Sequence, residues 1–246
     1  ASSRMSVVFG ACSPVGRAIV TRLSFAGHAV AAIDTDLNGL KELEEKASKV
    51  GAKVSAVPLE KDEPTTMAAA EAKLDKGMTG LVVVPPQNEV RGDIAHATQM
   101  QFNTVFAQRL TLPFRIVKAA IPLLKKNENA SVVFVNSSTA FTPFVDIGLY
   151  SAASSGLLAL ARTLSLQPGV LPVRVNSVLL STTHSDGSGG VWENEDQASA
   201  LRNMIPLGRL GAPVDAAGAV EFLLSPKSRY ITGESILLSG GVQLRL

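Results

Sequence analysis

Short apolar runs recur along this chain, and stretches with helical spacing of apolar residues lie between them. The runs are rich in Val, Leu and Ile and are too short to be buried helices. Strands that alternate with helices form βαβ units, whose parallel strands lie side by side under helices on both faces. The alternation therefore predicts an α/β fold built on a mainly parallel sheet. The predicted strands are Met5–Phe9, His28–Ile33, Lys53–Leu59, Gly80–Val84, Val132–Val135, Val173–Leu179 and Glu234–Leu238. The first predicted helix ends at about Phe25, and further helices are predicted over Leu40–Val50, Met67–Leu74 and Ala216–Leu224. A long helix is predicted within Ile94–Lys126, with Pro113 as the candidate for a bend. Another helix is predicted to start at Tyr150.

Nothing in the sequence divides the chain into parts. The 246 residues contain no internal repeat and no linker-like segment, and 46% of them are apolar, which is enough for one large core. We therefore predict a single domain over residues 1–246. One segment, Thr182–Gln197, is rich in Ser, Gly and Asp and is expected to be a mobile loop.

Charge and composition exclude several classes of partner. The formal net charge is only +2, and no run of Lys or Arg is longer than two residues. We therefore expect no nucleic acid and no anionic membrane as a partner. No apolar run reaches the roughly 18 residues of a membrane-spanning helix. With no secretory signal pattern and a single cysteine, which cannot form an internal disulfide, the sequence predicts a cytoplasmic protein.

The histidines and the cysteine give no metal site. His28, His96 and His184 lie far apart and lack the spacing of metal ligands. Cys12 follows the first predicted strand, where a helix N-terminus could lower a thiol pKa, but no histidine or second cysteine is near it in sequence. We expect structural roles for all four residues and no metal.

The stretch from Ala130 to Leu166 carries the candidate chemistry. A buried strand ends in two serines, Ser137 and Ser138, and a loop leads to Tyr150 at the start of a helix of small residues. This stretch resembles the catalytic segment of the short-chain dehydrogenase/reductase (SDR) family, in which a strand-end Ser and a Tyr-x-x-x-Lys helix perform acid–base chemistry. In this chain Ser154 stands where the family has its lysine.

The resemblance covers nearly the whole chain. Its C-terminal part is carried by Ile205-Pro-Leu-Gly-Arg-Leu-Gly211, Tyr230-Ile-Thr-Gly-Glu234 and Ser239-Gly-Gly241. It implies a Rossmann-like, doubly wound fold: a seven-stranded, mainly parallel sheet with helices on both faces.

The glycine-rich turn of the family binds the cofactor pyrophosphate through backbone amides at a helix N-terminus. Gly10 and Gly16 match its first and third glycines, whereas Phe9 replaces its threonine and Pro14 its middle glycine. Proline removes a donor and adds a ring, although it is also favoured at the first position of a helix. The turn therefore predicts no cofactor or weakly bound NAD.

Other cofactor positions are partly retained. Asp34 follows the second strand, where an acidic residue accepts hydrogen bonds from a ribose and disfavours a 2′-phosphate, so NAD is expected over NADP if either binds. The alternative is that Asp34 only starts a turn. Glu60 lies near the adenine-contacting position of the family. Val84-Pro85-Pro86-Gln87 replaces the family turn Asn-Asn-Ala-Gly, and Leu180-Ser181 replaces Pro-Gly. The two prolines are expected to make their turn stiff and to crowd the path of the cofactor.

The resemblance assigns roles to the catalytic candidates. The tyrosine is the general acid or base, the serine holds the substrate oxygen and the lysine lowers the tyrosine pKa. A tyrosine of pKa about 10 is ionised in only about one molecule in a thousand at pH 7, so Tyr150 without a lysine is a poor base. Ser137, thirteen residues before Tyr150, has the family spacing and is preferred to Ser138. The family's helix Asn aligns with Arg109, and Asn103 is expected to face elsewhere.

Three functions follow from these residues. The first is a degenerate, non-catalytic SDR subunit that pairs with an active SDR paralogue in a dimer or tetramer, a hetero-oligomeric NAD-dependent alcohol or hydroxyacyl dehydrogenase. Small residues Ala152, Ala153 and Gly156 would allow close helix approach in such an assembly. The second is an active SDR oxidoreductase with an atypical Ser-Tyr site, in which another cation such as Arg109 serves in place of the lysine. The third is a lyase similar to halohydrin dehalogenases, a related family that uses Ser, Tyr and Arg.

Overall fold

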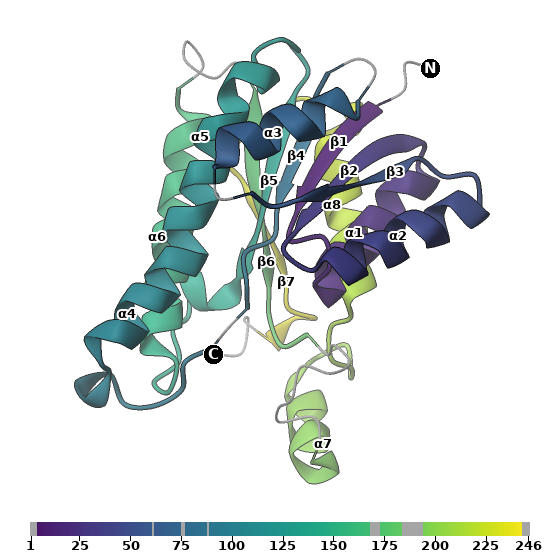
Figure 1. Ribbon diagram of the computed structural model, residues 1–246. Helices are drawn as coiled ribbons and strands as arrows, with labels where there is room; N and C mark the ends of the chain where they lie inside the picture. The colour runs from purple at the N-terminus through teal and green to yellow at the C-terminus, as the bar shows by residue number, and fades with distance from the viewer. Residues whose placement is uncertain are drawn as a thin grey trace.

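The computed structural model describes residues 4–60, 62–74, 77–87, 89–167, 173–183 and 194–242. In these ranges seven strands form one sheet in the order β3-β2-β1-β4-β5-β6-β7, and every neighbouring pair is parallel (Figure 1). The strands are β1 Arg4–Phe9, β2 His28–Asp34, β3 Val54–Pro58, β4 Gly80–Val83, β5 Ser131–Ser137, β6 Arg174–Leu180 and β7 Ser235–Leu238. The predicted fold class is confirmed, and each predicted strand agrees with the observed one to within about two residues at either end.

Helices cover both faces of the sheet. One face carries α3, α5 and α6, and the other carries α1, α2 and α8, each burying an apolar stripe against the strands (Figure 1). The helix α7 stands away from the sheet. The bounds are α1 Pro14–Phe25, α2 Leu37–Lys49, α3 Glu63–Ala72, α4 Gln99–Phe106, α5 Leu112–Leu124, α6 Gly148–Ser165, α7 Glu195–Met204 and α8 Pro213–Leu224. Short 3-10 turns lie at Ile94–His96, Ser138–Ala140 and Pro226–Ser228.

The strand order places a crevice at the carboxyl ends of the strands. The chain runs outward from β1 to β3 and then crosses back to β4 on the other side of β1. Connections that leave two adjacent parallel strands in opposite directions open a crevice at their carboxyl ends, and ligands of doubly wound folds bind there. The crevice lies where β1 ends at Phe9 and β4 at Val83.

The long helix predicted within Ile94–Lys126 is divided. Ile94–His96 is a 3-10 turn, and α4 starts only after Thr98, whose side chain forms a capping box with Gln101. A π turn of five residues, η2 (Ala107–Thr111), then joins α4 to α5. Pro113 lies in the first turn of α5, directly after the π turn, and it cannot donate a backbone hydrogen bond to a carbonyl of that turn. The irregularity is thus the π turn, which precedes the proline.

The expected loop Thr182–Gln197 is only partly described. Residues 184–193, which include His184, lie outside the described residues. Its last residues belong to α7, whose first turn holds Glu195 and Asp196, acidic side chains that favour a helix N-terminus. The loop prediction was therefore wrong at that end. None of the helices in the described ranges is long and apolar enough to cross a membrane.

Candidate active site

The candidate site residues come together at the carboxyl edge of the sheet. The turn after β1, Asp34 at the end of β2, Ser137 at the end of β5 and Tyr150 in the first turn of α6 all lie at this edge. The sequence had placed them on separate segments, and the strand order now makes them neighbours along one crevice.

Both matching glycines are required by the packing of the turn itself. Gly10 has φ +75°, and a Cβ there would lie 2.1 Å from the carbonyl oxygen of Val84. A Cβ at Gly16 would lie 2.0 Å from the carbonyl oxygen of Gly10. Any side chain at either position would displace backbone, so these glycines are explained by close packing whether or not a phosphate binds.

The turn satisfies much of its own hydrogen bonding. Ser13 is the N-cap of α1: its Oγ accepts from the Gly16 amide at 3.0 Å and donates to the Gly10 carbonyl at 2.7 Å. Pro14 occupies the first helical position, as expected of a capping proline, and has no N–H. The turn therefore offers a phosphate fewer amide donors than a glycine-rich helix start normally does.

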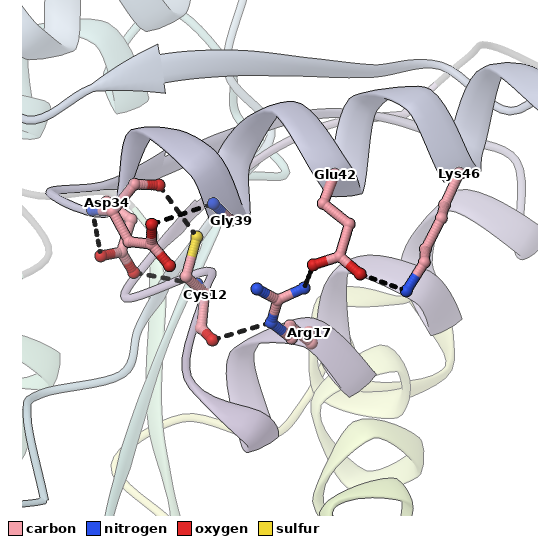
Figure 2. Close-up of polar contacts among 7 residues, drawn as sticks. Cys12, Arg17, Asp34, Gly39, Glu42 and Lys46 are labelled. Atoms are coloured by element: carbon pink, nitrogen blue, oxygen red, sulfur yellow. Dashed lines mark hydrogen bonds and ion pairs between the residues drawn. The ribbon is translucent and has the colours of Figure 1, made fainter.

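Asp34 is fixed by backbone donors from two turns. Its carboxylate accepts from the amides of Cys12 at 2.9 Å, Thr35 at 2.8 Å and Asp36 at 3.2 Å (Figure 2). Burial, followed by the nearby Asp34 charge, raises the pKa of the Cys12 thiol to about 12. Cys12 is thus a protonated thiol that closes the turn, in line with its expected structural role.

A cation also lies beside this turn. The Arg17 guanidinium donates from Nε to the Cys12 carbonyl at 2.9 Å and from Nη1 to Glu42 at 2.8 Å, and Lys46 pairs with the same Glu42 (Figure 2). Glu42 therefore faces two cations, and it balances the charge of Arg17 only in part.

A cavity of about 350 Å³ opens beside the turn that follows β1. This volume is at the lower end of the range of small-molecule sites, about 300–1,000 Å³. Its polar lining residues include Asp34 and Asp36, and its apolar lining residues include Leu59 and Leu112. An adenosine fits this combination of an apolar slot and a ribose acceptor, so the residues suit the adenosine half of a nicotinamide dinucleotide. The other lining residues are Phe9, Gly10, Cys12, Ser13, Thr35, Val84, Pro85 and Pro86.

The proline turn replaces the family's Asn-Asn-Ala-Gly at the inner end of this cavity. Pro85 and Pro86 line the wall rather than fill the space. The Pro86 carbonyl oxygen accepts from Arg109 Nη1 at 3.0 Å. The crowding expected from the two prolines does not remove the cavity, and they also tie this turn to the catalytic side.

Tyr150 and Ser137 interact directly. Tyr150 is 3% exposed and Ser137 8% exposed, and the Ser137 hydroxyl lies close enough to the phenol to favour its ionised form. Burial raises the pKa of Tyr150 above its usual value of 10, the Arg109 charge and the Ser137 hydrogen bond oppose this, and Glu89 adds to it. Ser138 instead opens a 3-10 turn. Ser137, the preferred serine, is therefore the one beside the phenol.

Arg109 supplies a cation to this pair. It comes from the π turn η2, is 1% exposed, and its guanidinium carbon lies 4.0 Å from the centroid of the Tyr150 ring. Nη1 donates to the Pro86 carbonyl and Nη2 to Asn136 Oδ1 at 3.2 Å. Both acceptors are neutral, so the charge of the guanidinium is left to act on the phenol. Burial lowers the pKa of Arg109, but an arginine stays protonated in proteins.

The lysine position is small and buried. Ser154 is fully buried, and its Oγ has no hydrogen-bond partner among the described residues. Its carbonyl oxygen accepts from Asn136 Nδ2 at 2.9 Å. The sequence interpretation did not include Asn136. The available signal was a single amide just before the serines, in a strand that is otherwise apolar and buried.

The remaining candidates lie outside this cluster. Asn103 is exposed and pairs with Gln99, so it faces elsewhere as expected, and the Glu60 side chain is exposed. Among the described residues no group of three His, Cys, Asp or Glu side chains could hold a metal ion.

The chain is similar to known proteins over nearly its full length. A family model described as enoyl-(acyl carrier protein) reductase matches residues 10–243. Dehydrogenase/reductase SDR family member 4 of Homo sapiens is 28% identical, over 100% of this chain and 89% of that protein. A short chain oxidoreductase of Pseudomonas aeruginosa PAO1, solved with NADPH and described as containing an atypical catalytic center, is 31% identical, with a TM-score of 0.87 over 97% of this chain and 96% of that one. A gluconate 5-dehydrogenase from Burkholderia cenocepacia, solved with NADP and tartrate, is 15% identical with a TM-score of 0.89 over 99% and 96%, a likeness of fold alone.

Proposed function

Since the chain belongs to the short-chain dehydrogenase/reductase family, we propose that it is an oxidoreductase that reduces a carbonyl group at an atypical site formed by Ser137, Tyr150 and Arg109. The observation that carries the proposal is the buried guanidinium of Arg109, 4.0 Å from the Tyr150 ring centroid. This ranks the atypical active enzyme above the non-catalytic subunit that the missing lysine had favoured.

The ionisation of Tyr150 favours reduction over oxidation. A phenol with a raised pKa is protonated at pH 7, so it is a poor base but carries the proton that a reduction requires. In a reduction Tyr150 gives its proton to the substrate oxygen, which the Ser137 hydroxyl holds in place. A bound reduced nicotinamide would supply the hydride.

Arg109 stabilises the phenolate that the proton transfer leaves behind. Two unit charges 4 Å apart interact by about 4 kcal/mol at an effective permittivity of about 20, and this is an upper bound for the pair. The guanidinium therefore opposes the rise in the Tyr150 pKa that burial causes. The guanidinium on the ring face thus serves in place of an ammonium group beside the hydroxyl.

The cavity favours NADH over NADPH. Asp34 and Asp36 both line it, and a 2′-phosphate would meet two carboxylates there. The nearby Arg17 is paired with Glu42, and this pairing reduces the attraction of Arg17 for a phosphate. Calorimetric titration should therefore show tighter binding of NADH than of NADPH, and the reverse order would refute the assignment of Asp34.

Turnover tests the proposal. The purified chain is mixed with NADH or NADPH and a panel of aldehydes and ketones, and the loss of reduced cofactor is followed by absorbance. Tyr150→Phe should abolish activity and Arg109→Met should lower kcat about tenfold or more. Arg174→Met is the matched control, because Arg174 is a partly buried arginine at the amino end of β6 that bonds Ser228 and nearby carbonyls away from the site. Full activity in Tyr150→Phe would refute the proposal, and halide release from halohydrins would support the lyase instead.

A non-catalytic subunit is the second candidate, and one observation favours it. Tyr150 is 3% exposed and is not among the residues that line the nucleotide cavity, so its phenol is poorly accessible. In this case the chain would complete an assembly with an active SDR paralogue. Purification of the native protein should then yield a second SDR chain, and Tyr150→Phe should leave the activity of the complex unchanged.

A further inference from the structure

We propose that Asn136 is a positioning residue that holds the Arg109 guanidinium over the Tyr150 ring, an inference that rests on the proposed function. Asn136 is the residue before the last in β5 and is fully buried. It is not among the residues that line the cavity, and it acts through the arginine.

One amide connects three elements at this point. Asn136 Oδ1 accepts from Arg109 Nη2 of the π turn at 3.2 Å and from the Ser137 amide of β5 at 2.8 Å. Its Nδ2 donates to the Ser154 carbonyl of α6 at 2.9 Å. Tyr150 lies one helical turn before Ser154, so the same amide fixes both members of the Arg109–Tyr150 pair relative to the end of β5.

The orientation of this amide is set by its partners. Arg109 and the Ser137 amide are donors only, so both require the oxygen, whereas the Ser154 carbonyl is an acceptor only and requires the nitrogen. A flipped amide would lose all three hydrogen bonds. Removing it would leave Arg109 with the Pro86 carbonyl as its remaining acceptor, and a guanidinium held by one neutral acceptor can turn away from the ring.

The chain offers a matched control. Asn176 is 1% exposed in β6, donates from Nδ2 to the Ile231 carbonyl at 2.9 Å and accepts at Oδ1 from the Glu234 amide at 3.1 Å. It is also a buried strand asparagine that joins two elements, and it does so away from Tyr150. A general loss of packing should appear equally in Asn136→Ala and Asn176→Ala.

The chain contains two tyrosines, which makes the phenol itself observable. Biosynthetic replacement of tyrosine by a fluorinated analogue with a more acidic phenol brings the titration into a range where the protein stays folded. Fluorine NMR then shows one signal for Tyr150 and one for Tyr230, which is fully exposed and serves as an internal reference.

The expected result is a rise in the pKa of Tyr150 of about one unit in Asn136→Ala, a tenfold loss of phenolate at fixed pH, and no rise in Asn176→Ala. Arg109→Met should raise the pKa by at least as much. In the Arg109→Met background Asn136→Ala should add nothing, because its effect passes through the arginine. Asn136→Ser, which keeps a short polar side chain at the strand end, replaces Asn136→Ala if the alanine variant fails to fold.

Two outcomes distinguish a failure of the Asn136 role from a failure of the proposed function. A shift in Arg109→Met without one in Asn136→Ala and Asn136→Ser would overturn the positioning role and leave the proposed function standing. No shift in Arg109→Met would remove the basis of the proposed function, and the role of Asn136 would fall with it. An equal shift in Asn136→Ala and Asn176→Ala would also overturn the positioning role.

Discussion

His28 should make the fold unstable in mild acid. It lies at the start of β2, is 2% exposed, and its Nδ1 is 2.8 Å from Ser6 Oγ, while its Nε2 has no hydrogen-bond partner among the described residues. Burial, with a smaller effect of the Arg4 charge, lowers the pKa of His28 from 6.5 to about 4. A proton on the ring would therefore be taken up by the unfolded chain far more readily than by the folded one.

Proton linkage gives the direction and the size of the loss of stability that His28 causes in acid. Because the pKa in the folded state lies below that in the unfolded state, the stability is fully present above about pH 6.5 and is lost as the pH falls from there toward 4. The full shift corresponds to about 3 kcal/mol, and roughly 2 kcal/mol of it is lost between pH 7 and pH 5. A domain with a free energy of unfolding of about 5–15 kcal/mol would lose a measurable part of it.

The assay compares pH dependence rather than absolute stability. Urea unfolding, followed by far-ultraviolet circular dichroism at pH 7 and pH 5, gives the loss for the wild type and for His28→Asn, which keeps an amide near Ser6 but cannot titrate. His96→Asn is the control, because the His96 side chain is 86% exposed. The wild type and His96→Asn should lose about 2 kcal/mol more than His28→Asn. Equal losses in all three proteins would refute the argument.

Three further outcomes are expected. Pro14→Gly, which restores an amide at the first position of α1, should tighten NADH binding several-fold in calorimetry, and unchanged affinity would show that the proline only caps the helix. The raised pKa of Cys12, about 12, should slow its alkylation at pH 8 at least a hundredfold relative to a free thiol, as measured by mass spectrometry, and fast labelling would contradict it. If α6 forms an interface, Ala152→Arg should reduce the assembly mass in light scattering. Ala152 is chosen because it is exposed, whereas Ala153 is buried and Gly156 packs against Leu110 of its own chain.

The strands could be predicted because each is buried on both faces, which makes it a short apolar run with little alternation. Runs such as Val132–Val135 leave no other arrangement than the centre of a parallel sheet. The path between Ile94 and Lys126 could not be predicted as well. A π turn differs from an α turn by one residue, and the apolar spacing of the segment does not register that difference.

The candidate site was predictable where one residue type carries the chemistry. Ser137, Tyr150 and Asp34 were identified through the resemblance to the SDR family, and Arg109 because it aligns with the family's helix Asn. That Arg109 would lie on the ring of Tyr150 depends on the π turn, which has no local sequence signature, and on Asn136, whose partners Arg109 and Ser154 are distant from it in sequence. Pro85 and Pro86 line the cavity, and the sequence could not give the orientation of their turn, on which their effect on cofactor binding depends.

The π turn also accommodates one extra residue inside a continuous helical segment. A π turn holds about one residue more than an α turn, so five π residues turn the chain by about as much as four α residues. The exposed side chains of α4, Met100 and Phe102, therefore keep the direction they would have on an uninterrupted helix, while Arg109 lies buried within the π turn beside Tyr150. Removing one residue from Ala107–Thr111 should therefore displace the buried cation and leave the outward face of α4 in place.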